Sequence, residues 1–148
     1  MPQTELPQRI RKVIYERIVG TGVAPTVHEV AAVEALDLTD VTDAFKTLAE
    51  SHVVVLKPGT VELWSAPPFS AVPSSFRVHG AAVSWYAPCA WDMFGVPAAL
   101  SEDALLEAKC AWSGERLPAT VRRGAVEGAG VVHLEVPARH FWDDIFYT

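Results

Sequence analysis

The chain has 148 residues, of which 50% are hydrophobic and 20% charged, a composition typical of a folded globular protein that can bury a real core. Its formal net charge of −6 gives no general excess of lysine and arginine for holding nucleic acid. No apolar run approaches the roughly 20 residues that span a bilayer, and the first residues lack a signal-peptide pattern. We therefore expect a cytoplasmic protein without a membrane segment, whose two cysteines are free thiols.

The pattern of apolar, capping and turn residues in 1–65 is typical of a winged helix-turn-helix module. Apolar residues recur at helical spacing from Leu6 to Ile18, and the glycines at 20 and 22 end that helix. Thr26 is suited to cap a second short helix, and a third follows from Thr39. The apolar runs at 53–56 and 61–64, separated by a turn with proline and glycine, predict a two-stranded wing.

The charge of this module argues against nucleic acid as a partner. Residues 1–65 contain six lysines and arginines against nine aspartates and glutamates, a net charge of −3. The helix that would enter a DNA groove carries a single basic residue, Lys46, among the acids Asp40, Asp43 and Glu50. Phosphate contacts need the opposite balance.

A proline-rich stretch separates this module from the rest of the chain. Residues 66–75 contain three prolines among serines and alanines, which predicts an extended linker outside any sheet or helix. Within residues 76–148, the alternation of apolar and polar residues predicts strands at 76–79, 81–85, 107–112, 117–122 and 130–136. An apolar helix is expected from Cys89 to Leu100, and a final helix is expected to begin near His140. The predicted fold class is α+β, with the helical module packed on a mixed or antiparallel sheet that holds a central helix.

The strongest candidate for chemistry is the pair Cys89 and Asp92. If the chain becomes helical after Pro88, the spacing of three residues places thiol and carboxylate on neighbouring points of one helical face. A helix N-terminus favours the thiolate, whereas a neighbouring carboxylate disfavours it, so a proton shared by the two groups is the useful arrangement. A small buried cysteine beside a turn-capping aspartate would give the same pattern.

Two motifs around this pair resemble those of a known family. The run Phe76-Arg77-Val78-His79-Gly80, followed by Cys89-Ala90-Trp91-Asp92-Met93-Phe94, is similar to the core signature of the alkylmercury (organomercurial) lyases, and Cys110-Ala111-Trp112-Ser113-Gly114-Glu115 resembles a turn further along that signature. The resemblance implies that Cys89 attacks the mercury of an organomercurial and that Asp92 relays a proton to the departing carbon. It implies no required cofactor, with Hg(II) or another soft metal as substrate, product or ligand.

The chain departs from the family pattern at one position. The family's second catalytic cysteine precedes a stretch like His133–Pro137, and residues 128–132 contain no cysteine. An exogenous thiol is therefore an expected partner. Cys110 and His133 could complete a makeshift metal site with Cys89, although a structural thiol and a buried neutral histidine are the simpler interpretations. Three aromatic residues, Trp85, Tyr86 and Trp91, could wall an apolar pocket or belong to the core.

Three hypotheses follow. The first is a lyase-like enzyme that uses Cys89 and Asp92 on a carbon–mercury or related bond. The second is a related protein without catalysis that binds a soft metal or small apolar ligand through Cys89. The third is a winged-helix regulator that senses a ligand through its C-terminal half.

Overall fold

The computed structural model describes residues 5–147 and has an α+β fold. Three helices come first, α1 (Glu5–Thr21), α2 (Val27–Glu34) and α3 (Leu38–Glu50). One further α-helix, α4 (Ala90–Leu100), lies within the second half of the chain. The strands are β1 (Val55–Leu56), β2 (Leu63–Ala66), β3 (Phe69–Ser70), β4 (Phe76–His79), β5 (Ser84–Ala87), β6 (Ala104–Lys109), β7 (Arg116–Arg122) and β8 (Ala125–Gly128), and a 3-10 helix spans Ala138–His140.

The three helices predicted for the N-terminal half are present. Ile10, Ile14 and Ile18 are buried on one face of α1, at the spacing of successive helical turns. The Thr26 side chain caps α2, and the Glu29 carboxylate accepts the backbone N–H of Thr26 in return, which completes a capping box. The third helix buries Val41, Ala44, Phe45 and Leu48.

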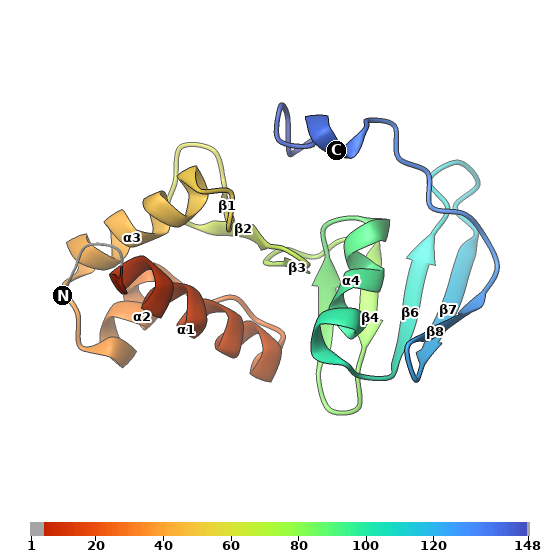
Figure 1. Ribbon diagram of the computed structural model, residues 1–148, viewed down its shortest axis with the longest axis horizontal. Helices are drawn as coiled ribbons and strands as arrows, with labels where there is room; N and C mark the ends of the chain where they lie inside the picture. Colours follow the sequence, from red (N-terminus) through yellow and green to blue (C-terminus); the bar gives the residue numbers. More distant parts are fainter. Residues whose placement is uncertain (1–4, 148) are drawn as a thin grey trace.

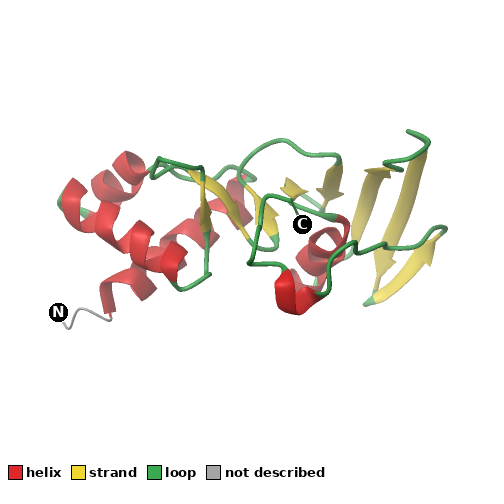
Figure 2. Ribbon diagram, turned by 90° about the horizontal axis from the view of Figure 1, so that it is seen from above, coloured by secondary structure: helices red, strands yellow, loops and turns green. Residues whose placement is uncertain are grey.

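All eight strands join one antiparallel sheet, in the order β1-β2-β3-β5-β4-β6-β7-β8. The hairpin β1–β2 lies directly after α3, and the sheet continues from it to the far edge at β8, as Figure 1 shows. Helix α4 packs against β3, β4, β5 and β6. Figure 2 shows the three helices at one end of an elongated molecule and most of the strands at the other.

The expected linker is in fact part of the sheet. Within residues 66–75, Phe69 and Ser70 form β3, which pairs with β2 on one side and β5 on the other. Pro67 and Pro68 occupy the turn between β2 and β3, where a missing backbone N–H breaks no ladder hydrogen bond. The prediction of a linker outside the sheet was therefore wrong, because these prolines make a turn within it.

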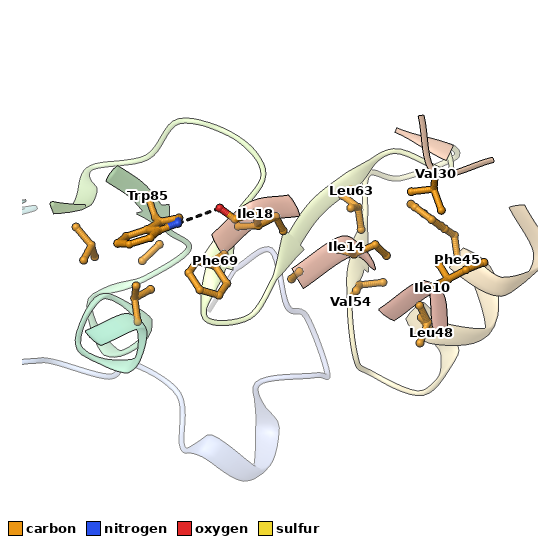
Figure 3. Packing of buried hydrophobic residues seen from close by; sticks show 14 of the residues in the cluster. Ile10, Ile14, Ile18, Val30, Phe45, Leu48, Val54, Leu63, Phe69 and Trp85 are labelled. Atoms are coloured by element: carbon orange, nitrogen blue, oxygen red, sulfur yellow. Dashed lines mark hydrogen bonds between the residues drawn. The ribbon is translucent and has the colours of Figure 1, made fainter. Parts of the chain in front are cut away.

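The two halves share one hydrophobic core. The indole N–H of Trp85, on β5, donates a hydrogen bond of 2.9 Å to the backbone carbonyl of Ile18 at the end of α1 (Figure 3). The ring of Phe69 lies 6.2 Å from that of Trp85, between it and the helical core. Gly80 makes room for the same indole, since a Cβ there would lie 2.7 Å from the Trp85 ring.

Two expectations for the C-terminal part were also wrong. Residues 130–136 form no strand. The chain turns at Arg123 and Gly124, and β8 begins directly after the turn, where Ala125 pairs with Arg122, so β8 takes the place beside β7. The final helix is reduced to the 3-10 turn at 138–140. The segment after β8 instead returns across the molecule to the helical half (Figure 1), where Trp142 stacks on His52 with ring centroids 4.1 Å apart.

Within the described residues, no helix is long and apolar enough to cross a membrane.

Candidate active site

Cys89 lies between β5 and α4 and is itself the N-cap of the helix. Its backbone is extended, at φ −147° and ψ 174°, and its sulfur accepts a hydrogen bond of 3.5 Å from the backbone N–H of Asp92. The chain becomes helical after Pro88, as expected, and Pro88 itself precedes the cap. The cap position fixes the sulfur over the open N–H groups of the first helical turn.

Asp92 lies on the first turn of α4, within reach of this sulfur. The thiol of Cys89 donates toward the carboxylate Oδ2 at 3.6 Å. Both side chains are only partly accessible to solvent. The predicted juxtaposition of thiol and carboxylate is thus present, with backbone N–H and carboxylate meeting at one sulfur atom.

Burial, more than the helix, sets the acidity of the thiol. Desolvation raises the pKa of Cys89, the N–H groups of Asp92 and Trp91 lower it, and the charge of Asp92 raises it again, with a net increase. The N–H groups of the helix start therefore favour the thiolate and the carboxylate disfavours it, as expected, and burial, which the sequence did not reveal, decides the net direction. The thiol keeps its proton at neutral pH until a base or an electrophile removes it.

The carboxyl group of Asp92 is shifted in the direction that suits proton transfer. Burial raises the pKa of Asp92, and the hydrogen bond from Cys89 offsets part of that rise. A carboxylate that is poorly solvated accepts a proton more readily than one in water. The pair can therefore pass one proton between sulfur and carboxylate.

Tyr15, from the distant helix α1, lies near enough for the charge of Asp92 to act on it. The Tyr15 hydroxyl on α1 donates a hydrogen bond of 2.9 Å to the carbonyl of Pro67. Burial raises the pKa of Tyr15, the charge of Arg11 offsets part of the rise, and the charge of Asp92 adds to it. Gly95, on α4, lets the helix approach the ring of Pro68, because a Cβ there would lie 3.2 Å from the Pro68 Cβ. Sequence reasoning missed Tyr15 and Pro67, since no local pattern links them to Asp92.

The three aromatic candidates do not form one pocket. Trp85 and Tyr86 are neighbours on a strand and point to opposite faces of the sheet, Trp85 into the core and Tyr86 toward Arg77. Trp91 is 62% exposed at the start of α4. The core interpretation holds for Trp85, and only Trp91 adjoins Cys89 in the chain.

Cys110 belongs to a different local structure. It follows β6 in the turn to β7, where its backbone N–H donates to the carbonyl of Glu115 at 2.8 Å. Hydrogen bonds from the side chain and backbone of Ser113, together with the N–H of Trp112, lower the pKa of its thiol. Cys110 is therefore the more acidic of the two thiols.

His133 is exposed in an irregular segment, so the expectation of a buried strand histidine was wrong. Within residues 5–147, no three side chains of His, Cys, Asp or Glu gather closely enough to hold a metal ion together. The makeshift ligand set of Cys89, Cys110 and His133 is thus not assembled in this fold.

Fold and site together define a chain with a thiol–carboxylate pair at the start of a helix that packs on an antiparallel sheet. The alkylmercury lyase family matches residues 69–147, more than half of the chain, and the chain belongs to this family. Among solved structures, the mercury-bound form of MerB2 has a similar fold, with a TM-score of 0.64 and 24% identity over 86% of this chain. The present chain spans 60% of the length of that protein. No curated protein sequence matches.

Proposed function

We propose that this chain is an organomercurial-lyase-like enzyme that cleaves a carbon–mercury bond with Cys89 as nucleophile and Asp92 as proton relay. The observation that carries the proposal is the 3.6 Å contact between the thiol and the carboxylate at the cap of α4, within a member of the alkylmercury lyase family. Mercury strongly prefers thiolate ligands, so a single well-placed sulfur is enough to bind the organomercurial.

The first step joins the sulfur to mercury. As the Cys89 sulfur displaces the anion X from R–Hg–X, its proton passes to the carboxylate of Asp92, giving a Cys89–S–Hg–R adduct. The raised pKa of Asp92 suits this step, because the desolvated carboxylate can hold the proton, while the raised pKa of Cys89 means that the thiol still carries its proton when the substrate arrives.

The second step breaks the carbon–mercury bond. A thiolate from a small exogenous thiol adds to mercury and increases the electron density on the metal. The carbon then takes the proton from Asp92 and leaves as R–H, while Hg(II) stays bound by two sulfurs and Asp92 returns to a carboxylate. The external thiol supplies the sulfur that the chain does not place beside Cys89, since Cys110 lies in the β6–β7 turn.

Variants of the pair test this proposal through release of benzene from phenylmercury in excess small thiol. Cys89→Ser should abolish turnover, and Asp92→Asn should slow it by roughly 10²–10⁴-fold, the usual contribution of a positioned proton donor. Cys110→Ser is the matched control and should retain the rate of the wild-type chain. Unchanged benzene release by the Cys89→Ser variant would refute the assignment.

A soft-metal-binding protein without turnover is the second candidate. The observation in its favour is that the other cysteine, Cys110, lies in the β6–β7 turn and not in the turn that leads into α4. It predicts Hg(II) uptake by one site that is lost in Cys89→Ser, with no benzene formed at any thiol concentration. The acidic N-terminal module gives no such support to a regulator that binds DNA.

A further inference from the structure

A cavity lies on the sheet face opposite to α4, and neither Cys89 nor Asp92 lines it. Strand registry places Arg77 of β4, Glu107 of β6 and Pro118 of β7 side by side, with Tyr86 beside Arg77 on β5. Val78 and Trp85, which alternate with these residues, point to the buried face instead. The cavity, of about 390 Å³, is large enough for a small ligand.

The cavity has an excess of positive charge within an acidic chain. Arg77, Lys109 and Arg116 line it, against the single carboxylate of Glu107. That carboxylate is already engaged, because it lies 3.0 Å from Nε2 of His79. His79 pairs with Leu105, two residues before Glu107 on β6, whereas Lys109 lies two residues after it. The contact with His79 therefore directs the Glu107 carboxylate away from Lys109.

Two of the cations stand directly opposite each other. Lys109 and Arg116 are cross-strand partners at the end of the β6–β7 hairpin. Within residues 5–147, neither is in ion-pair contact with a carboxylate. Like charges at directly opposed positions destabilise an antiparallel pair, whereas an anion held between them would remove that cost.

The third cation is held in a fixed orientation. The Arg77 guanidinium lies over the ring of Tyr86, with its Cζ 4.6 Å from the ring centroid, and one of its terminal nitrogens donates to the Tyr86 hydroxyl. This arrangement leaves further N–H donors of the same rigid fork available to a ligand. A guanidinium already held in place loses less side-chain freedom on binding.

We propose that this cavity binds a phosphate group, either free or carried by a small organic molecule. Phosphate has the charge to neutralise Lys109 and Arg116 together and the oxygens to accept from a guanidinium fork. The hydroxyl of Ser75, also at the rim, offers a further donor. The site is independent of the proposed lyase chemistry, because it involves neither Cys89 nor Asp92.

Isothermal titration calorimetry of the full chain tests the proposal, with inorganic phosphate and phenyl phosphate as ligands and chloride to match ionic strength. Saturable binding is expected, and the double variant Lys109→Gln/Arg116→Gln should weaken it by at least about tenfold, since two charge-assisted interactions are removed. Tighter binding of phenyl phosphate would identify an organic phosphate as the ligand class, and equal binding would identify the phosphate group alone.

Arg122→Gln provides the matched control. Arg122 lies on β7, on the same face as Arg116 but six residues away, and does not line the cavity. It should retain the phosphate affinity of the wild-type chain while losing one positive charge. Circular dichroism and thermal unfolding confirm that each variant folds. Absence of saturable binding by the wild-type chain, or equal affinity in the double variant, would overturn the proposal.

Discussion

At the scale of single residues, two cysteines with nearly opposite properties stand out. Cys89 caps a helix, yet burial and the carboxylate of Asp92 raise its pKa. Cys110 lies in an open turn, where hydrogen bonds from Ser113 and Trp112 lower its pKa. Acidity alone would therefore point to Cys110 and not to the proposed nucleophile, Cys89. The carboxylate partner distinguishes Cys89, because proton transfer needs a donor and an acceptor in contact.

This contrast predicts the pH dependence of alkylation by iodoacetamide. In a Cys110→Ser background, which leaves Cys89 as the reporter, the rate should rise with pH through a midpoint above that of free cysteine, because only the thiolate reacts. Asp92→Asn removes a negative charge and replaces a carboxylate acceptor with a weaker amide, and because both features of Asp92 favour the thiol, the midpoint should move to lower pH. The rate measured by mass spectrometry across pH provides the check, and an unchanged midpoint in the Asp92→Asn variant would contradict the contact.

At the scale of elements, local patterns predict those structures whose causes are local. The Thr26 cap of α2 and the apolar spacing of α1 and α3 involve residues within one or two turns, and the sequence predicts all three helices. The placement of Cys89 and Asp92 at the start of α4 also depends on nearby residues only. Their spacing and the resemblance to a known signature were therefore enough to predict it.

Elements that depend on distant partners could not be predicted in this way. Strand β3 depends on a distant partner, because Ser70 pairs with Tyr86. The local sequence contains only the prolines before it, and these predict a linker. The apolar alternation of residues 130–136 looks like a strand, yet β8 has already taken the edge of the sheet, and Val131 is 92% exposed. Tyr15 lies beside Asp92 only because α1 packs against the β2–β3 turn.

At the scale of the whole molecule, one core extends from the helices into the sheet. Trp85 is 4% exposed and bonds to Ile18 of α1, while Gly80 of the signature run provides space for its ring. Gly80, the last residue of the signature run 76–80, thus serves the packing of the two halves against each other. The pair Cys89 and Asp92 lies at the same junction, since α4 contacts the β2–β3 turn, whose Pro67 carbonyl accepts the Tyr15 hydrogen bond.

The shared core predicts that both halves unfold together. Trp85→Ala should lower the free energy of unfolding by about 3–5 kcal/mol, the usual cost of removing a large buried aromatic side chain. Trp85→Phe keeps most of the packing and loses the hydrogen bond to Ile18, so about 0.5–1.5 kcal/mol is expected. Urea unfolding followed by circular dichroism and by the reactivity of Cys89 should give coincident transitions. Two separate transitions would show that the halves are independent.

The central claim is that Cys89 and Asp92 cleave a carbon–mercury bond with help from an external thiol. The initial rate of benzene release from phenylmercury, measured against the concentration of a small thiol, tests it most directly. Multiple turnovers are expected, with a rate that rises from almost nothing to a plateau as thiol is added. Benzene release that does not depend on added thiol, or none at any thiol concentration, would contradict it.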